Sequence, residues 1–213
     1  SLKRTTHCFS TGTPTQPPCV RPEGTEREQV QVNAVLVRSP RFAEARAALP
    51  DTLEVVTTFD DLRTLPTLAA ECAGHAGVSD HGEAILRHGI DLIVISIGAL
   101  ADRELYDRLS AAASEGGAKL LLPAGAVAGA DALAAARVGG LSEVVYISRK
   151  PPRAWKGTLA EDIVDLERLA DETVLYDGSA GEATRLYPQN ANVAATIALA
   201  GIGFDHTKVR LVA

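Results

Sequence analysis

The sequence predicts an α/β protein with a Rossmann-like, doubly wound parallel sheet, followed by an α+β domain. Three observations favour this fold class. Residues 92–95 of the segment 91–97 are all apolar, without polar alternation, as in a central parallel strand buried on both faces. Strand-like and helix-like segments alternate from residue 32 onward. The apolar strand 120–122 leads through small residues into a helix that Gly139 and Gly140 terminate.

The pattern changes near Pro123, where we place the boundary between domains 32–123 and 124–213. In the first domain we expect strands at 33–37, 53–57, 67–73, 91–97 and 120–122, and helices at 40–49, 78–88 and 102–115. In the second domain we expect strands at 143–149, 173–177 and 208–213, and helices at 127–138, 181–186 and 192–199. The predicted face of the 127–138 helix includes Val127 and Val138.

Residues 1–31 differ from the rest of the chain. Thr, Pro and charged residues dominate them, without an apolar period of either a strand or a helix. The segment also contains no G-x-G-x-x-G motif, the turn that binds the pyrophosphate of a dinucleotide. We therefore expect residues 1–31 to be disordered, so that the Rossmann-like domain lacks its first strand and its glycine-rich turn.

Composition narrows the range of partners and locations. The net charge of −6 and the pI of about 5.4 argue against nucleic acid or an anionic membrane as a partner. The apolar run 92–101 is too short to cross a bilayer. The three cysteines are few and odd in number, which suits a reducing cytoplasm. The five histidines are scattered, so we predict no metal site.

Ligands of doubly wound sheets bind beyond the C-terminal ends of the strands. These ends are expected at Ala73-Gly74-His75, Ser96-Ile97-Gly98 and Pro123-Ala124-Gly125. The ring of His75 either faces a bound ligand or only starts a helix. Gly125 and Ala126 either offer backbone N–H groups to a ligand or form a tight packing turn.

Two stretches of the second domain carry polar groups that suit a ligand. The cations of the loop after residue 148 could bind an acidic substrate or the 2′-phosphate of a nicotinamide cofactor, or they are simply solvated. Asn190 and Asn192 precede an apolar helix and either cap it or contact a cofactor amide. The loop cations are Arg149, Lys150, Arg153 and Lys156.

Several motifs resemble the L-aspartate dehydrogenase family over residues 32–213. They are Glu71-Cys72-Ala73-Gly74-His75, Ser96-Ile97-Gly98-Ala99-Leu100, Ala124-Gly125-Ala126-Val127, Arg149-Lys150-Pro151-Pro152 and Tyr187-Pro188-Gln189-Asn190-Ala191-Asn192-Val193-Ala194-Ala195-Thr196. The resemblance implies NAD- or NADP-dependent oxidative deamination of L-aspartate to iminoaspartate, which feeds NAD biosynthesis. It also implies a second domain that carries catalysis and the contacts of a homodimer.

The family's cofactor contacts map onto the backbone amide of Ala126 and onto Asn192, and we add Ala73, Gly74 and His75 from the strand end. The family's catalytic histidine lies beyond Ala213, so we expect no catalytic residue here and an incomplete, inactive fragment. The alternatives are an oxidoreductase of the homoserine dehydrogenase or dihydrodipicolinate reductase type, or a non-catalytic nucleotide-binding or dimerisation module. The choice between NAD and NADP depends on geometry near the second strand, which the sequence leaves open.

Overall fold

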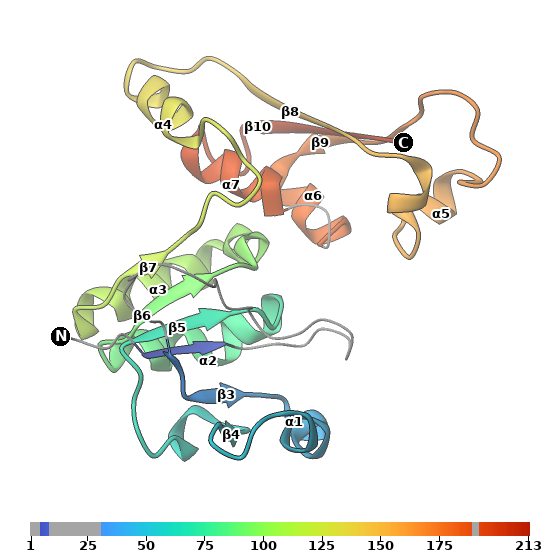
Figure 1. Cartoon of the computed structure of the whole chain (residues 1–213). Helices are drawn as coiled ribbons and strands as arrows, with labels where there is room; N and C mark the ends of the chain where they lie inside the picture. Colours follow the sequence, from blue (N-terminus) through green and yellow to red (C-terminus); the bar gives the residue numbers. More distant parts are fainter. Residues whose placement is uncertain (1–4, 9–30, 189–191) are drawn as a thin grey trace, which may run out of the picture. The chain divides into compact units, whose positions relative to one another are not determined.

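The chain divides into two units, residues 1–123 and 124–213, each with its own sheet (Figure 1). The computed structural model describes residues 5–8, 31–188 and 192–213. No helix in these ranges is long and apolar enough to cross a membrane.

The first unit is built on parallel strands. Five of them pair in the order β2–β1–β5–β6–β7, and β3 pairs with β4. Only Asn33 separates β2 from β3, so the segment 31–36 joins the two sets of strands. The overall order is that of the doubly wound dinucleotide fold, with the switch point between β1 and β5. The fold class predicted from the sequence is confirmed. The strands are β1 (Thr5–Cys8), β2 (Gln31–Val32), β3 (Ala34–Leu36), β4 (Glu54–Val56), β5 (Leu68–Glu71), β6 (Asp91–Val94) and β7 (Leu120–Leu121).

The prediction that residues 1–31 form no strand is wrong, because β1 lies within them. This strand pairs in parallel with β2 on one side and with β5 on the other. It therefore takes the place of the first strand that the sequence analysis expected to be missing. Its four residues are too few to show an apolar period, and its position comes from two partners distant in sequence. The expected absence of a glycine-rich turn falls on residues 9–30, outside the described residues.

Helices of the first unit follow the strands closely. They are α1 (Phe42–Ala48), α2 (His75–Arg87) and α3 (Arg103–Gly116), with short 3-10 helices η1 (Ser39–Arg41), η2 (Phe59–Asp61) and η3 (Ile97–Ala101). Val78, Ile85 and Leu86 of α2 are almost fully buried. Helices α2 and α3 approach closely at Gly82, where an added β-carbon would lie 2.7 Å from the Leu109 Cδ2 atom. A larger residue at position 82 would force the Leu109 side chain to shift.

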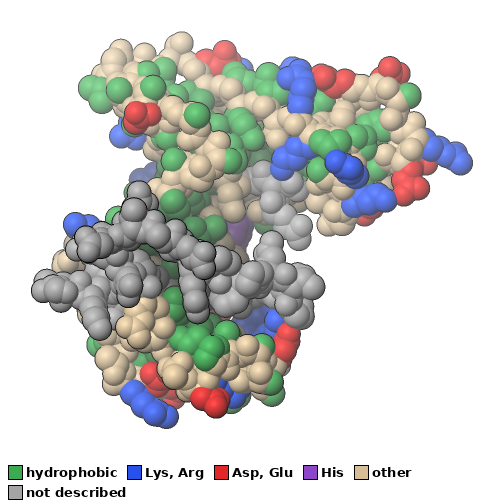
Figure 2. All heavy atoms as spheres, viewed as in Figure 1, with side chains coloured by type: hydrophobic (Ala, Val, Ile, Leu, Met, Phe, Trp, Pro, Cys, Tyr) green, Lys and Arg blue, Asp and Glu red, His purple; other side chains and the backbone are tan. Residues whose placement is uncertain are grey.

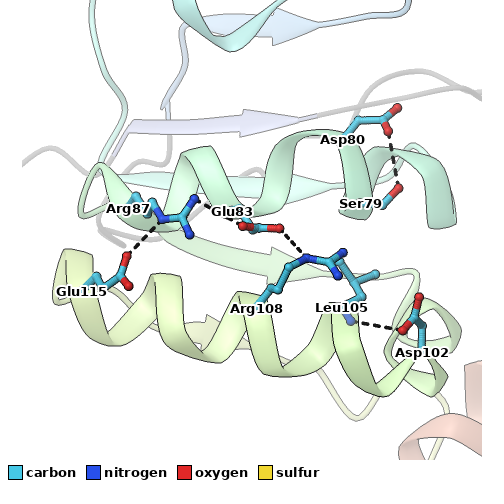
Figure 3. A network of polar contacts seen from close by, with 8 residues as sticks. All are labelled: Ser79, Asp80, Glu83, Arg87, Asp102, Leu105, Arg108 and Glu115. Carbon is cyan, nitrogen blue, oxygen red and sulfur yellow. Dashed lines mark hydrogen bonds and ion pairs between the residues drawn. The ribbon is translucent and has the colours of Figure 1, made fainter.

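Charged side chains join α2 to α3 along the exposed side of their contact (Figure 3). Glu83 accepts from Arg108 at 2.8 Å and pairs with Arg87 at 3.3 Å, and Arg87 also binds Glu115 at 3.0 Å. All four side chains are partly solvated, so each pair contributes little by itself. At the start of α3 the Asp102 carboxylate accepts from the Leu105 backbone N–H at 3.1 Å, which caps the helix.

The second unit has a mixed sheet, as expected of an α+β domain. Strand β10 pairs in parallel with β8 and antiparallel with β9. Trp155 and Tyr187 pack edge to face in the core, with ring centroids 6.1 Å apart, and both are almost fully buried. The elements are α4 (Ala130–Val138), β8 (Val144–Arg149), η4 (Pro152–Trp155), α5 (Ala160–Ile163), β9 (Val174–Ser179), α6 (Ala180–Leu186), α7 (Asn192–Ala200) and β10 (Thr207–Val212).

Two details of the predicted pattern are wrong. Helix α4 begins at Ala130, so Val127 lies outside it, and Val138 is 87% exposed rather than part of a buried face. Gly129, at φ 78°, has the left-handed conformation and delays the helix start. Strand β6 is shorter than predicted and Ile95 beyond it is 45% exposed, so the apolar run is not covered on both faces throughout.

The cap at the start of α3 gives a direct stability test. Replacing Asp102 by Ala should lower the free energy of unfolding by about 0.5–2 kcal/mol, because the Leu105 N–H loses its acceptor. Asp107→Ala is the control, since its carboxylate is 64% exposed and lies 3.8 Å from Arg103. Urea unfolding of both variants checks this, and an equal loss in the two would contradict the capping role.

Candidate functional site

A buried carboxylate ties together the C-terminal ends of β5 and β6. Glu71, the last residue of β5, is 2% exposed. Its Oε1 atom accepts from the backbone N–H groups of Ala73 and Gly74 at 2.6 and 2.8 Å. The hydroxyl and the backbone N–H of Ser96 donate to the same carboxylate at 3.0 and 2.9 Å. These bonds substitute for water around a charge that would otherwise be costly to bury.

The turn after β5 follows from these bonds. Gly74 has φ 87°, a conformation that favours glycine, and α2 begins at the next residue. No atom of the described residues lies within 4 Å of a β-carbon placed on Gly74, so these residues leave open space beside its backbone. Ala73 and Gly74 thus form a fixed edge of small residues at the C-terminal end of the sheet, beside Ser96.

His75 is the first residue of α2. It therefore starts a helix, which was one of the two roles that the sequence left open. Its side chain is half-buried, and burial lowers the pKa of its imidazole below the ordinary value of 6.5. The negative charge of Glu71 opposes this effect without cancelling it. A lowered pKa keeps the ring neutral at pH 7, able to donate from one nitrogen and accept at the other.

The second unit holds the other predicted cofactor contacts. Ala126 is exposed in a turn closed by a hydrogen bond from Val127 N–H to the Ala124 carbonyl at 3.0 Å. Gly125 has φ 60°, and a β-carbon added there would meet no atom of the described residues within 4 Å. The backbone of this turn is therefore accessible on the side of Gly125.

Asn192 is the first residue of α7 and is half-buried. Its carbonyl accepts from the Thr196 hydroxyl at 3.0 Å, which holds the first turn of the helix. Asn190 lies outside the described residues.

The cations of the loop after residue 148 are mostly occupied within the second unit. Arg149 makes two hydrogen bonds to Glu172, at 2.8 and 3.2 Å, and Lys156 binds Glu167 at 2.8 Å. The ammonium of Lys150 lies 5.3 Å from the centre of the Trp155 ring. Cationic and acidic side chains accordingly lie side by side over this part of the unit in Figure 2. Arg153 is exposed and has no carboxylate partner among the described residues.

The geometry of the first unit fits a dinucleotide. The parallel order with its switch point, the small residues at the strand ends and the open space at Gly74 are what such a ligand needs. Among the described residues, no three His, Cys, Asp or Glu side chains gather as metal ligands would. Fold and site together define a dinucleotide-binding domain of the kind found in NAD(P)-dependent enzymes.

Comparison with known proteins agrees with this class. Residues 22–123 match the model of the homoserine dehydrogenase NAD-binding domain, and residues 131–213 match that of the aspartate dehydrogenase C-terminal domain. L-aspartate dehydrogenase of Cupriavidus taiwanensis is 49% identical over 86% of this chain and 70% of its own length. The Pseudomonas aeruginosa L-aspartate dehydrogenase is 46% identical over 87% and 70%, respectively. The chain belongs to the L-aspartate dehydrogenase family.

A solved structure supports the fold independently. The crystal structure of aspartate dehydrogenase from Thermotoga maritima aligns with 99% of this chain and 78% of its own, with a TM-score of 0.68. The two sequences are 23% identical, so this likeness concerns the fold alone. The family resemblance found in the motifs is confirmed by the sequence comparisons, and the structural likeness supports the fold.

Sequence reasoning listed the strand-end residues but missed the group that positions them. Glu71 was part of a motif, yet nothing in its spacing identified it as buried. One signal was available: a lone carboxylate ending a strand of small and apolar residues, since Glu is almost never fully buried unless it is paired. Ser96, its partner on the neighbouring strand end, has no local signature at all.

The carboxylate of Glu71 should carry a large share of the stability of the first unit. Glu71→Ala should lower the free energy of unfolding by about 3–4 kcal/mol, because three backbone N–H groups lose their acceptor. Glu71→Gln, which keeps one acceptor oxygen, should lose about 1–2 kcal/mol. Glu104→Ala, an exposed carboxylate on α3, is the control and should change stability by less than about 0.5 kcal/mol. Urea unfolding measures all three, and equal effects of Glu71→Ala and Glu104→Ala would refute this role.

The lowered pKa of His75 predicts how stability varies with pH. The unfolded chain takes up the proton near pH 6.5 and the folded protein only at lower pH. The contribution of the neutral His75 to the free energy of unfolding should therefore be fully present above pH 6.5. It should decrease as the pH drops from there toward the pKa of His75 in the folded protein. Burial lowers the pKa of His81 as well, so both histidines contribute in the same direction.

Proton NMR of the imidazole, followed through a pH titration, measures the His75 pKa directly. Glu71→Gln removes the negative charge that raises this pKa, so the variant should show a still lower value. A His75 pKa that rises in Glu71→Gln would contradict the assigned causes.

Proposed function

We propose that this chain serves the oxidative deamination of L-aspartate to iminoaspartate with NAD or NADP. The observation that carries the proposal is identity of 46–49% to relatives named L-aspartate dehydrogenase, over 86–87% of the chain. Residues 131–213 of the second unit match the aspartate dehydrogenase C-terminal model, which supports the same substrate. Dinucleotide-binding enzymes share the fold of the first unit, so the second unit is where a specificity for aspartate would distinguish this family.

Residues of both units are assigned to cofactor binding. Ala73, Gly74 and His75 border the end of β5, where the open space at Gly74 lets a ligand approach the backbone. In the second unit the backbone amide of Ala126 and the side chain of Asn192 take this role. Exposure of Ala126 in its turn and the place of Asn192 at the start of α7 support the assignment.

The reaction divides into a hydride transfer and a proton transfer. The nicotinamide supplies the hydride acceptor when it is bound. The α-carbon of the substrate gives up a hydride and its amino nitrogen a proton, which leaves the C=N bond of iminoaspartate. A neutral His75 ring at the edge of the site can orient a polar group by a hydrogen bond. Proton transfer is the role of the family's catalytic histidine, which the resemblance puts C-terminal to β10.

A homodimer in the cytoplasm completes the proposal. The strand β8 is at the edge of its sheet, and its outward residues Val145 and Ile147 are 50% and 44% exposed. Exposed aliphatic side chains on an edge strand suit pairing with a second copy. The three cysteines of the chain are few and odd in number, which supports a reducing compartment.

The substrate assignment is tested with the chain joined to the C-terminal segment of a relative. We expect L-aspartate-dependent formation of reduced nicotinamide, followed by its absorbance. Oxidation of homoserine or turnover of dihydrodipicolinate in place of L-aspartate would instead identify one of the alternative oxidoreductases. A joined protein that binds a dinucleotide but turns over none of these substrates would favour a binding or dimerisation module.

In the same joined protein, Asn192→Ala should chiefly weaken cofactor binding. Loss of one polar contact costs about 1–3 kcal/mol, which corresponds to roughly tenfold or more in the dissociation constant. Gln31→Ala removes an exposed amide at the start of β2 and serves as the matched control. Calorimetric titration with the dinucleotide gives both constants, and an unchanged value in Asn192→Ala would remove this residue from the site.

A further inference from the structure

An arginine is the first exposed residue where the chain leaves the sheet after β3. Leu36 and Val37 are buried, and the Val37 N–H still donates to the Val56 carbonyl beside β4 at 2.9 Å. The Arg41 N–H then donates to the Arg38 carbonyl at 2.8 Å and closes η1. Arg38 is thus fixed between the strand and this turn, with its side chain exposed.

The place of β3 in the sheet puts this arginine where dinucleotide-binding folds hold the adenosine ribose. The segment that contains β2 and β3 is the second strand of the doubly wound order, next to β1 and the switch point. In this fold the residue after the second strand faces the adenosine ribose of the cofactor. A carboxylate there accepts a hydrogen bond from the 2′-hydroxyl of NAD, whereas an arginine accommodates the 2′-phosphate of NADP.

No carboxylate follows β3 closely in the chain. Residues 37–43 contain neither Asp nor Glu, and the first acidic residue, Glu44, is bound to Arg41 at 2.8 Å. A 2′-hydroxyl would therefore find no acidic acceptor in this stretch. A phosphate would find the guanidinium of Arg38 and the exposed hydroxyl of Ser39 next to it.

Arg38 also differs from the other arginines of its unit. Within the described residues of 1–123, each of the others has a carboxylate within 4.0 Å, and Arg38 has none. Those paired arginines are Arg41, Arg46, Arg63, Arg87, Arg103 and Arg108. A guanidinium without an internal partner keeps its donors for a ligand.

The sequence alone offered the loop after residue 148 as a rival phosphate site. Two of its four cations, Arg149 and Lys156, are paired with Glu172 and Glu167, which lowers the net positive charge of that loop. We propose that Arg38 binds the 2′-phosphate of NADP and makes this chain prefer NADP to NAD. This inference rests on the proposed function in one respect, which is that the dinucleotide binds at the C-terminal edge of this sheet.

Calorimetric titration of the full chain with NADP and with NAD tests the preference without any turnover. We expect NADP to bind at least about tenfold more tightly than NAD, as a charge-assisted contact to phosphate provides. Arg38→Ala should weaken NADP binding by about tenfold or more and leave NAD binding within about twofold. Arg38→Lys should retain part of the preference, because a point charge replaces the planar fork.

Two control variants locate the effect. Arg63→Ala removes an arginine whose side chain is 90% exposed and which pairs with Glu54 at the start of β4, so both affinities should stay unchanged. Arg153→Ala tests the rival loop and should also leave the preference intact. The preference should shrink as salt is raised, since the contact is between exposed charges.

Several results would overturn the inference. Equal affinity for NAD and NADP would do so, as would an Arg38→Ala variant that weakens both dinucleotides alike or neither. Loss of the preference in Arg153→Ala would move the phosphate to the second unit. Absence of binding at about millimolar dinucleotide would overturn it together with the cofactor assignment. Equal binding combined with aspartate-dependent turnover in the joined protein would refute this inference alone and leave the proposed function standing.

Discussion

The carboxylate of Glu71 is the constraint on which the C-terminal edge of the first sheet depends. Its four hydrogen bonds reach the turn after β5 and the end of β6, so one buried group fixes both strand ends at once. Without it, three N–H groups at this edge would need water, and the turn into α2 would lose its internal anchor. The same turn leads into α2 at His75, and the negative charge of Glu71 raises the pKa of that imidazole against the effect of burial.

Local patterns in the sequence predicted most of the elements because each has a local cause. The apolar run that becomes β6, the glycines that end α3 and α4, and Asp102 before α3 all act within a few residues. Strand β1 was missed because its pairing with β2 and β5 is wholly non-local and its four residues carry no period. The exposure of Val138 was missed for a related reason: helical spacing predicts a face, but only packing decides whether anything covers it.

The site was predictable to a lesser degree. Strand ends could be located from the chain, since small residues follow apolar runs there, and Gly74 has the conformation that such a turn requires. What the sequence could not provide was the state of each charged group. Among the loop cations, Arg149 and Lys156 look available for a ligand in the sequence, but in the structure they are ion-paired with Glu172 and Glu167. Glu71 shows the reverse, because its burial and its partner Ser96 depend on a strand contact 25 residues away.

Glu71 and Arg38 lie on opposite sides of the switch point, so the two residues act on different parts of a bound dinucleotide. Glu71 organises the ends of β5 and β6, whereas Arg38 follows β3 on the far side of β1. A dinucleotide that crosses such a sheet at its switch point presents its two halves to the two sides. The buried carboxylate acts through backbone geometry, so its loss would disturb any ligand at that edge. The exposed guanidinium acts through its charge, so its loss would be felt only by a ligand that carries the additional phosphate.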